Sequence, residues 1–461
     1  MDTATSSKTL KVITLGCRAN QAESDTWTRS MASAGFRQAG EHEHADVVMV
    51  NTCVVTNAAE KQSRQFIRRM VRQHPGAQVV VTGCGAELRQ KEWAQIPGVS
   101  QIISNKQKPE FLKDPQKFVS FTSTITTTST STLKRVRYVR ANLMIQDGCK
   151  DMCTYCIIPY VRPNRVSKPI AEVLTELQAL VDGGAAEIIL TGINLGTYEY
   201  GLAKLLLDLQ SSLRRHPSVG WDPTTSEANC NVVPPFEGDS SLRWNDGLKR
   251  LRFSSLEPAH LTSDFITQAA AFPTLCAHFH LCLQSGDDQI LKAMGRGYTT
   301  ADFSALLERF RSAYAAVGRT VSFSTDLIVG FPGETEAQFQ NSLDFCRQIN
   351  FNKIHVFPFS KRSRTPAAKM SDQVPPPLIQ RRVHEALALS TELSLGFAQR
   401  YLGSCVEVLV DEKSDVEKGM TENHVKVVIQ NADAHKLSLG ELVLVKVLSV
   451  LADGSVAGAL L

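Results

Sequence analysis

The chain has 461 residues, with 50 Lys and Arg against 46 Asp and Glu and a formal net charge of +4. This length exceeds one ordinary hydrophobic core, so we expect two or three domains. The balanced charge excludes a wholly basic nucleic-acid coat, so any RNA contact must come from local patches. The 11 cysteines lack disulfide-like spacing, no apolar run could span a membrane, and residues 1–9 are unlike a signal peptide, which together indicate a reducing cytoplasm.

Three strand-like runs in the first 120 residues are each followed, within a short loop, by a cysteine. These runs alternate with segments of helical period, which is typical of a parallel α/β sheet. The runs and their cysteines are Leu10–Leu15 with Cys17, Ala45–Val50 with Cys53, and Gln78–Thr82 with Cys84. Since the carboxyl ends of parallel strands share one edge, these cysteines can converge. Cysteine often simply fills core space, but three at equivalent positions favour a site that uses three thiolates.

Two stretches read as connectors between packed elements. Ten of the eleven residues from Thr122 to Thr132 are Ser or Thr, a composition that buries too little apolar surface to fold alone. From His216 to Leu242 the chain is rich in Pro, Gly, Ser and Asn. We expect the first stretch to be a linker and the second to be a surface insertion.

The run Gly148–Ile157 places three cysteines, Cys149, Cys153 and Cys156, in a CxxxCxxC spacing. Three thiolates this close can hold three irons of a 4Fe-4S cluster and leave the fourth iron open. Zinc is the alternative, but zinc sites usually pair one CxxC with another, and the chain has no second CxxC. The spacing therefore favours an iron-sulfur cluster, and we assign the five cysteines outside the two triplets to packing or exposed positions.

The middle of the chain repeats a strand-then-helix pattern about six times. Six such units predict an incomplete parallel barrel rather than an eight-fold one. The strand-like runs are Leu143–Gln146, Ala186–Thr191, Arg250–Phe253, His278–Leu283, Val321–Val329 and Lys353–Phe357. Active sites of such folds gather at the carboxyl ends of the strands.

Several of these strand ends carry residues that are similar to one family. The chain resembles the radical S-adenosylmethionine methylthiotransferases in four segments: Gly148–Ile158, Thr191–Asn194, Leu283–Gly286 and Asp326–Thr335. The resemblance covers nearly the whole chain. The stretch His355–Ala368 is similar to the branch that acts on tRNA carrying N6-threonylcarbamoyladenosine at position 37.

This resemblance implies two 4Fe-4S clusters and S-adenosylmethionine as cofactors. The cluster on Cys149, Cys153 and Cys156 would bind S-adenosylmethionine, and the cluster on Cys17, Cys53 and Cys84 would supply sulfur. No catalytic residue is implied beyond these ligands. The residues implied to contact S-adenosylmethionine are Tyr155, Thr191, Gly192, Ser254 and Gly330.

Three groups of basic residues are candidates for RNA contact, although exposed basic faces are usually just solvated. They are Lys61, Arg64, Arg68, Arg69 and Arg72 on one predicted helix, Lys134, Arg135, Arg137 and Arg140 before the middle domain, and Lys361, Arg362 and Arg364 after its last strand. From Tyr401 onward, short strands predict a small β-barrel, which the resemblance identifies as a tRNA-binding TRAM domain. With five Lys and nine Asp or Glu, this part is acidic, which is unusual for an RNA-binding module.

The predicted organisation is an α/β protein with three domains. Residues 1–120 form a parallel α/β domain, 121–135 a linker, 136–398 a partial (β/α)6 barrel with an insertion at 216–242, and 399–461 a small β-barrel. We expect a cytoplasmic monomer that acts on a tRNA anticodon stem-loop, takes electrons from a flavodoxin or ferredoxin type of donor and uses an unidentified sulfur donor. The alternatives are the isopentenyladenosine tRNA enzyme, the ribosomal-protein aspartate enzyme and a non-catalytic iron-sulfur protein that binds tRNA.

Overall fold

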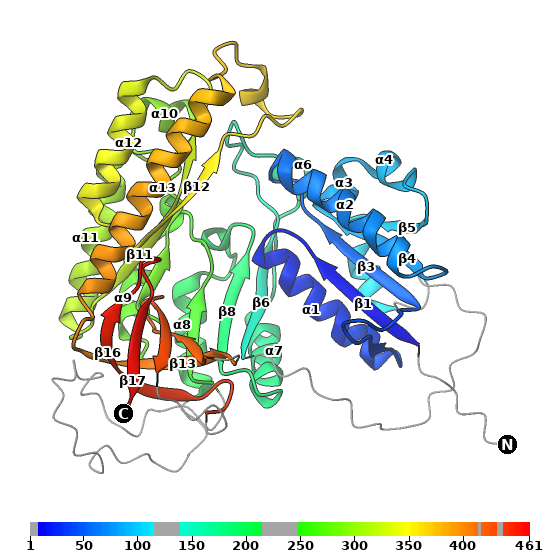
Figure 1. Ribbon diagram of the computed structural model, residues 1–461, viewed down its shortest axis with the longest axis horizontal. Coiled ribbons are helices and arrows are strands. Elements are labelled where there is room, and N and C mark those ends of the chain that lie inside the picture. The colour runs from blue at the N-terminus through cyan, green and yellow to red at the C-terminus, as the bar shows by residue number, and fades with distance from the viewer. Residues whose placement is uncertain (1–7, 115–138, 214–247, 414–415, 431–436) are drawn as a thin grey trace. The chain divides into compact units, whose positions relative to one another are not determined.

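The computed structural model describes residues 8–114, 139–213, 248–413, 416–430 and 437–461 (Figure 1). The predicted linker and the predicted insertion lie outside these residues. The chain divides into two compact units, the first made of residues 1–136, 147–166 and 360–369 and the second of 137–146, 167–359 and 370–461. The CxxxCxxC segment thus belongs to the first unit, whereas the sequence groups it with the middle domain, and the domain boundaries stay a prediction.

The first unit is built on a five-stranded parallel sheet of order β2-β1-β3-β4-β5. Its strands are β1 (Thr9–Thr14), β2 (Arg37–Gln38), β3 (Val47–Thr52), β4 (Gln78–Gly83) and β5 (Val99–Ile103). Its helices are α1 (Arg18–Ser33), α2 (Asn57–Gln73), α3 (Cys84–Leu88), α4 (Gln90–Ala94), α5 (Lys108–Lys113), α6 (Ile158–Val161) and η6 (Pro366–Lys369). The predicted runs therefore form strands within two residues of their expected bounds.

Helices bury both faces of this sheet, which is why β3 and β4 are almost continuously apolar. On one face, α1 and α5 supply Trp27, Met31 and Phe111 to a core shared with Met49. On the other face, α2 and α4 supply Ile67, Met70 and Trp93 to a core shared with Val50. These helices cover the faces of the sheet, so the loops at the carboxyl ends of its strands can serve a functional site.

The second unit carries six successive parallel strands. They are β6 (Arg140–Asp147), β8 (Glu187–Gly192), β9 (Arg250–Phe253), β10 (His278–His280), β11 (Ser322–Val329) and β12 (Lys353–Pro358), with a short β7 (Val166–Ser167) beside β6. Parallel bridges from Leu251 to Leu275 and from Leu256 to Leu281 link β9 to the chain around β10. The described residues therefore form the partial six-stranded α/β arrangement that the sequence predicts.

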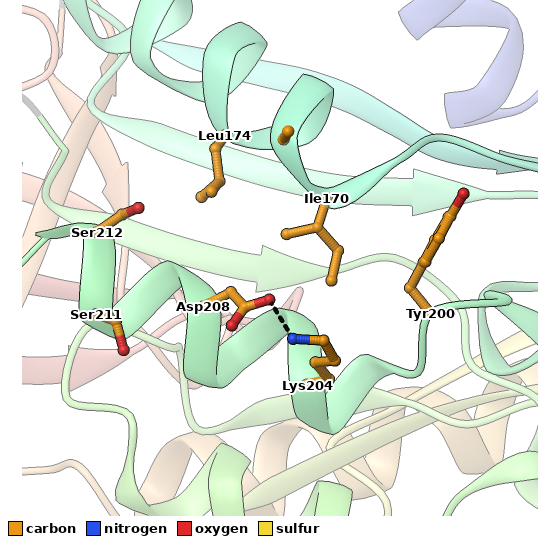
Figure 2. Close-up of a pocket in the computed structure, with 8 residues that line it drawn as sticks. Ile170, Leu174, Tyr200, Lys204, Asp208, Ser211 and Ser212 are labelled. Carbon is orange, nitrogen blue, oxygen red and sulfur yellow. Dashed lines mark hydrogen bonds and ion pairs between the residues drawn. The ribbon is translucent and has the colours of Figure 1, made fainter.

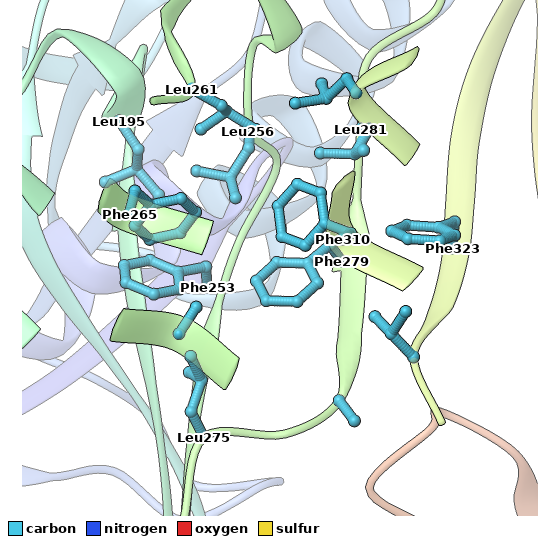
Figure 3. Packing of buried hydrophobic residues seen from close by; sticks show 14 of the residues in the cluster. Leu195, Phe253, Leu256, Leu261, Phe265, Leu275, Phe279, Leu281, Phe310 and Phe323 are labelled. Carbon is cyan, nitrogen blue, oxygen red and sulfur yellow. The ribbon is translucent and has the colours of Figure 1, made fainter. Parts of the chain in front are cut away.

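Helices between and after these strands cover one face of the strands and form a single large apolar core with them. The helices are α7 (Ile170–Asp182), α8 (Leu202–Leu213), α9 (Ser263–Ala271), α10 (Asp288–Met294), α11 (Thr300–Ala316), α12 (Glu336–Ile349) and α13 (Pro376–Gln399), with short turns η2 (Leu195–Thr197) and η5 (Pro258–His260). Figure 3 shows Phe253 and Phe279 from the strands meeting Phe265 and Phe310 from the helices. Alternation along each strand sends the intervening side chains to the opposite face.

The described residues between 405 and 460 form a closed five-stranded barrel within the second unit. The strands β13 (Cys405–Glu412), β14 (Lys418–Met420), β15 (Lys426–Gln430), β16 (Leu442–Val450) and β17 (Val456–Leu460) close in the order β13-β14-β15-β17-β16. Val408, Val427 and Val445 lie in its core. This confirms the small β-barrel predicted at this end. Among the described residues, no helix combines the length and apolarity that a membrane crossing needs.

Candidate functional site

The three strand-end cysteines lie at three loops along one edge of the first sheet. Cys17 caps the amino end of α1, Cys53 directly follows β3, and Cys84 directly follows β4 as the first residue of α3. β1 pairs with β3, and β3 pairs with β4, all in parallel. The register therefore brings the three loops to neighbouring places on the same edge.

Two glycines allow these loops to approach each other at backbone distance. Gly16 has φ +97°, and a Cβ there would lie 2.6 Å from the Cβ and 2.7 Å from the Sγ of Cys53. Gly83 has φ +94°, and its Cβ would lie 2.4 Å from the Thr52 carbonyl oxygen. Glycine is required at both positions for two reasons: the backbone is left-handed, and there is no room for a Cβ atom.

The thiols of the three loops also interact electrostatically. Burial raises the pKa of Cys53 to about 12, and Cys84 and Cys17 add to this increase. Neighbouring thiols that resist ionisation on their own become good ligands once a cation compensates their charge. Three converging sulfur donors thus fit a cluster that is anchored at three corners.

The second triplet occupies a loop that the same unit holds in place. The Asp151 N–H donates to Cys149 Sγ at 3.3 Å, and the Cys156 N–H donates to the Cys153 carbonyl at 3.0 Å. Gly148, with φ +76°, leaves no room for a Cβ, which would lie 1.9 Å from the Asn164 carbonyl oxygen. The CxxxCxxC thiols are half-buried, so the loop is anchored while its sulfur atoms keep partial access to solvent.

Apolar packing joins the surroundings of the two triplets. Val54, Cys84, Leu88, Ile157 and Val161 form one buried cluster. Val54 directly follows Cys53, and Ile157 directly follows Cys156. All six predicted cluster cysteines therefore lie in one compact unit, and the segments that carry Cys53, Cys84 and Cys156 share this apolar cluster.

The predicted S-adenosylmethionine contacts divide between the two units. Tyr155 belongs to the CxxxCxxC loop, whereas Thr191, Gly192, Ser254 and Gly330 belong to the second unit. These four lie at or directly after the carboxyl ends of the parallel strands β8, β9 and β11. They thus share the edge at which such folds bind ligands.

A residue that sequence reasoning missed organises the turn after β8. Gln146 is buried at the end of β6, and its Oε1 accepts the Asn194 N–H at 2.7 Å. A Cβ on Gly192 would lie 2.8 Å from the Gln146 carbonyl oxygen. A buried polar side chain directly before the CxxxCxxC segment is the signal that could have identified it.

The turn after β11 depends on an internal carboxylate. Gly330 has φ +80°, and its N–H donates to Glu334 Oε2 at 2.7 Å. The same oxygen accepts from Arg382 of α13 at 3.0 Å. A Cβ on Gly330 would lie 2.5 Å from the Ile379 Cγ1, so α13 packs directly against the glycine. The backbone of this turn is therefore held from two sides.

Three side chains on the face of the second-unit strands opposite the apolar core form a polar group. His280 Nε2 lies 3.1 Å from Asp326 Oδ1, and Cys282 Sγ lies 3.9 Å from Asp326 Oδ2. The Ser324 hydroxyl contacts His280 Nδ1 at 3.0 Å. Burial, followed by Asp326, raises the pKa of the Cys282 thiol. Cys282 was expected simply to pack or to be exposed, and the alternation of His278, His280 and Cys282 along the strand was the available signal.

The predicted basic patches differ in how far they are free to meet RNA. On α2, Lys61, Arg68, Arg69 and Arg72 are exposed, whereas Arg64 is half-buried and pairs with Glu60 and Glu92. Arg362 is 2 % exposed and pairs with Glu60 at 2.8 Å, so it is structural. Arg140 pairs with Glu187 and Asp411, and Lys134, Arg135 and Arg137 lie outside the described residues.

The acidic character of the C-terminal barrel has a structural use. Arg319 pairs with Glu422 at 2.8 Å, Arg250 with Glu407 at 3.3 Å and Arg140 with Asp411 at 2.9 Å. The Asn423 side chain donates to the carbonyls of Ala277 and Thr320 at 2.9 and 3.0 Å. The barrel thus docks through carboxylates and a buried turn onto the amino ends of β9, β10 and β11.

A shallow groove lies between α7 and α8 and is lined by residues that include Ile170, Tyr200 and Lys204 (Figure 2). Lys204 pairs there with Asp208 at 2.9 Å. No candidate site residue lines this groove, so we do not assign it to the functional site.

Two family models match this chain. Residues 9–104 match an uncharacterized protein family, UPF0004, and residues 143–346 match the radical SAM superfamily. The first match covers the sheet that carries Cys17, Cys53 and Cys84, and the second begins just before the CxxxCxxC segment. The superfamily match implies S-adenosylmethionine and a 4Fe-4S cluster.

Curated relatives extend over almost the whole chain. A threonylcarbamoyladenosine tRNA methylthiotransferase MtaB of Bacillus subtilis is 33% identical over 456 residues, covering 94% of this chain and 92% of the relative. Its namesake from Chlamydia pneumoniae is 32% identical, covering 88% and 87%. A tRNA-2-methylthio-N(6)-dimethylallyladenosine synthase of Carboxydothermus hydrogenoformans is 32% identical, covering 95% and 96%.

Solved structures support the fold. The radical S-adenosylmethionine methyltransferase TsrM from Kitasatospora setae, with cobalamin and a 4Fe-4S cluster bound, matches with a TM-score of 0.53 at 14% identity, covering 78% of this chain and 74% of that one. From the extent and identity of the curated relatives, this chain is an enzyme that belongs to the radical SAM tRNA methylthiotransferase family.

Proposed function

We propose that this enzyme inserts a methylthio group at carbon 2 of N6-threonylcarbamoyladenosine 37 in tRNA, with two 4Fe-4S clusters and S-adenosylmethionine. The observation that carries the proposal is the gathering of two cysteine triplets, each with three sulfur donors, in one compact unit. One triplet is enough to hold a radical SAM cluster, so the second triplet must serve a different function. Methylthio transfer, the activity of this family, also needs a source of sulfur, and we assign this function to the second triplet.

The substrate carbon explains why such cofactors are needed. An aromatic C–H offers neither an acidic proton nor a leaving group, so a general base or a simple nucleophile cannot form the carbon-sulfur bond. When bound, the cofactors supply radical chemistry and sulfur. The chain's own residues would hold them: Cys149, Cys153 and Cys156 one cluster, Cys17, Cys53 and Cys84 the other, and Tyr155, Thr191, Gly192, Ser254 and Gly330 the S-adenosylmethionine.

The exposed cations of α2 would contact the tRNA backbone. α2 starts four residues after Cys53, so a phosphate bound by Lys61 would lie on the unit that carries both triplets. Such contacts orient an RNA without reading its sequence. We further propose that the enzyme works in the cytoplasm on the anticodon stem-loop, as a monomer served by a flavodoxin or ferredoxin type of electron donor.

The dimethylallyladenosine substrate is the second candidate, because a relative with that name is nearly as similar as the two MtaB relatives. The two candidate nucleosides differ in the group on N6, and one carries a carboxylate where the other is apolar. The expected product therefore distinguishes the two candidates directly.

Expression in a bacterium that lacks methylthiotransferases for both candidate nucleosides tests the proposal. Mass spectrometry of tRNA nucleosides should show methylthio-N6-threonylcarbamoyladenosine with the wild-type chain and with the control Cys346→Ala, a buried cysteine outside both triplets. Cys149→Ala and Cys53→Ala should each abolish it. A methylthio group found only on isopentenyladenosine would instead assign the second candidate.

A separate assay addresses the non-catalytic alternative. Reduced, cluster-loaded protein mixed with S-adenosylmethionine should release 5'-deoxyadenosine, and Cys156→Ala should not. A wild-type protein that binds tRNA but releases none would be an iron-sulfur binding protein rather than an enzyme.

A further inference from the structure

Arg162 lies inside the first unit, and every N–H group of its guanidinium donates a hydrogen bond there. It is 3 % exposed and follows α6, six residues after Cys156. Its Nε donates to Cys84 Sγ at 3.2 Å, Nη1 donates to Glu23 at 2.9 Å and Asp147 at 2.7 Å, and Nη2 donates to Asn20 at 3.1 Å and Glu23 at 3.0 Å. A guanidinium has five N–H groups, and each of them has its own acceptor here.

The backbone of the same residue holds the other triplet. The Arg162 carbonyl accepts the Cys149 N–H at 3.0 Å, and the Arg162 N–H donates to the Ile158 carbonyl at 2.8 Å. Arg162 therefore touches one cysteine from each triplet, Cys84 through its side chain and Cys149 through its main chain.

The acceptors of Arg162 extend this connection to the remaining strand-end loops. Asn20 lies on α1, three residues after Cys17, and its Nδ2 donates to the carbonyls of Leu15 at 2.8 Å and Thr52 at 3.2 Å. Leu15 precedes the Cys17 loop, and Thr52 precedes Cys53. Glu23 is shared with Lys108 at 2.8 Å. One buried network thus spans all four cysteine-bearing segments.

We propose that Arg162 is a positioning residue that couples the two cluster sites and tunes the cluster on Cys17, Cys53 and Cys84 through its hydrogen bond to Cys84. This inference depends on the proposed second cluster. A hydrogen bond to a cluster sulfur, and a nearby cation, stabilise the reduced state and so raise the reduction potential. The effect is strong at a buried site, where water does not screen the charge.

Lysine cannot take over this role. Its ammonium group has three donors on one nitrogen, so it cannot reach the separated acceptors Cys84, Asp147 and Asn20 together. Arginine offers them a rigid planar fork. The arrangement therefore depends on the shape of the guanidinium as well as on its charge.

Redox titration of the holoprotein, followed by electron paramagnetic resonance, tests the proposal. Arg162→Lys and Arg162→Gln should shift the midpoint potential of the cluster on Cys17, Cys53 and Cys84 to more negative values, with the larger shift for Gln because it also loses the charge. Arg165→Gln is the matched control, since Arg165 is exposed three residues further on and should leave the potential unchanged. Unchanged potentials in cluster-loaded Arg162 variants would overturn the proposal.

If the Arg162 variants fail to fold, a measurement on the wild-type protein still tests the proposal. Holoprotein labelled with 15N-arginine, reduced in the absence of S-adenosylmethionine, should show a nitrogen coupling to a cluster in pulsed electron paramagnetic resonance. The lack of any arginine nitrogen coupling in protein that carries two clusters would overturn the inference and leave the proposed function standing. Iron and sulfide amounting to one cluster in wild-type protein would instead contradict the proposed function itself.

Discussion

Gly16 lies directly against the side chain of Cys53, so that a Cβ on residue 16 would fall 2.6 Å from the Cys53 Cβ. The loop that carries Cys17 and the loop that carries Cys53 are therefore in contact with no side chain between them. Holding three thiols around one small inorganic group requires this closeness.

We expect Gly16→Ala to displace Cys53 and to abolish retention of the cluster on Cys17, Cys53 and Cys84, while the cluster on the CxxxCxxC segment remains. Iron and sulfide content after anaerobic reconstitution should fall by about half. Gly76→Ala is the matched control, because Gly76 has φ +83° in the same unit and a Cβ there would meet no atom within 4 Å. Equal loss in both variants would show that backbone strain, rather than contact with Cys53, is responsible.

The pair Gly330 and Gly333 allows the same comparison in the second unit. Both have positive φ, but only Gly330 would direct a Cβ into Ile379. Gly330→Ala should lower the free energy of unfolding by about 1–3 kcal/mol more than Gly333→Ala. It should also weaken S-adenosylmethionine binding, measured by calorimetry, whereas Gly333→Ala should not. Unaltered binding in a folded Gly330→Ala protein would remove Gly330 from the proposed cofactor contacts.

Glu23 should give the first unit an acid-sensitive component of stability. Although burial alone would raise its pKa, Arg162 and Lys108 lower that pKa to about 2, from an ordinary 4.5. Because the folded value is the lower one, this stabilisation is complete above pH 4.5 and is lost as the pH falls toward 2.

Urea unfolding of cluster-free protein at several pH values measures this effect. Glu23→Gln should cost about 3–5 kcal/mol near neutral pH, because it leaves Arg162 and Lys108 without their buried counter-charge. The difference from wild type should shrink below pH 4.5. Glu110→Gln, at an exposed position of the same unit, should change neither the free energy of unfolding near neutral pH nor its dependence on pH. A Glu23→Gln difference that does not vary with pH would contradict the prediction.

Asn423 should hold the C-terminal barrel to the rest of the second unit. Its side-chain amide donates to two carbonyls, and its backbone carbonyl accepts from the Ser322 hydroxyl at 3.2 Å and the Asn352 side-chain amide at 3.1 Å. Asn423→Ala should leave the partners of its amide unsatisfied at a cost of about 1–3 kcal/mol. Hydrogen exchange in residues 405–460 should become faster, with Gln430→Ala, an exposed position on β15, as the control that stays slow.

The exposed face of α2 should bind tRNA phosphates. Changing Lys61, Arg68 and Arg72 to Gln together should weaken tRNA binding and reduce the slope of log affinity against log salt by about 1 for each phosphate that is no longer bound. Arg347→Gln, on an exposed part of α12 in the other unit, is the control. An unchanged slope would mean that these cations are simply solvated.

Much of the architecture could be predicted from the sequence because its signals are local. The Leu10, Ala45 and Gln78 runs each end in a cysteine loop, and parallel pairing alone brings such loops together. Contacts between distant residues carry no such signal. Arg362 looks like part of a basic surface patch, yet it pairs with Glu60 some 300 residues away. The use of Arg162, Gln146 and Asn423 was hidden for the same reason, since each depends on partners from other elements.

The docking of the C-terminal barrel limits what a truncated chain can reveal. Deleting residues 405–461 would strip Arg250 and Arg319 of their carboxylate partners and leave the carbonyls of Ala277 and Thr320 without the Asn423 amide. Buried cations and carbonyls stranded in this way destabilise the protein that remains. Weak tRNA binding by such a shortened enzyme would therefore report a damaged scaffold, and only point changes on the solvent side of the barrel can isolate its share in recognition.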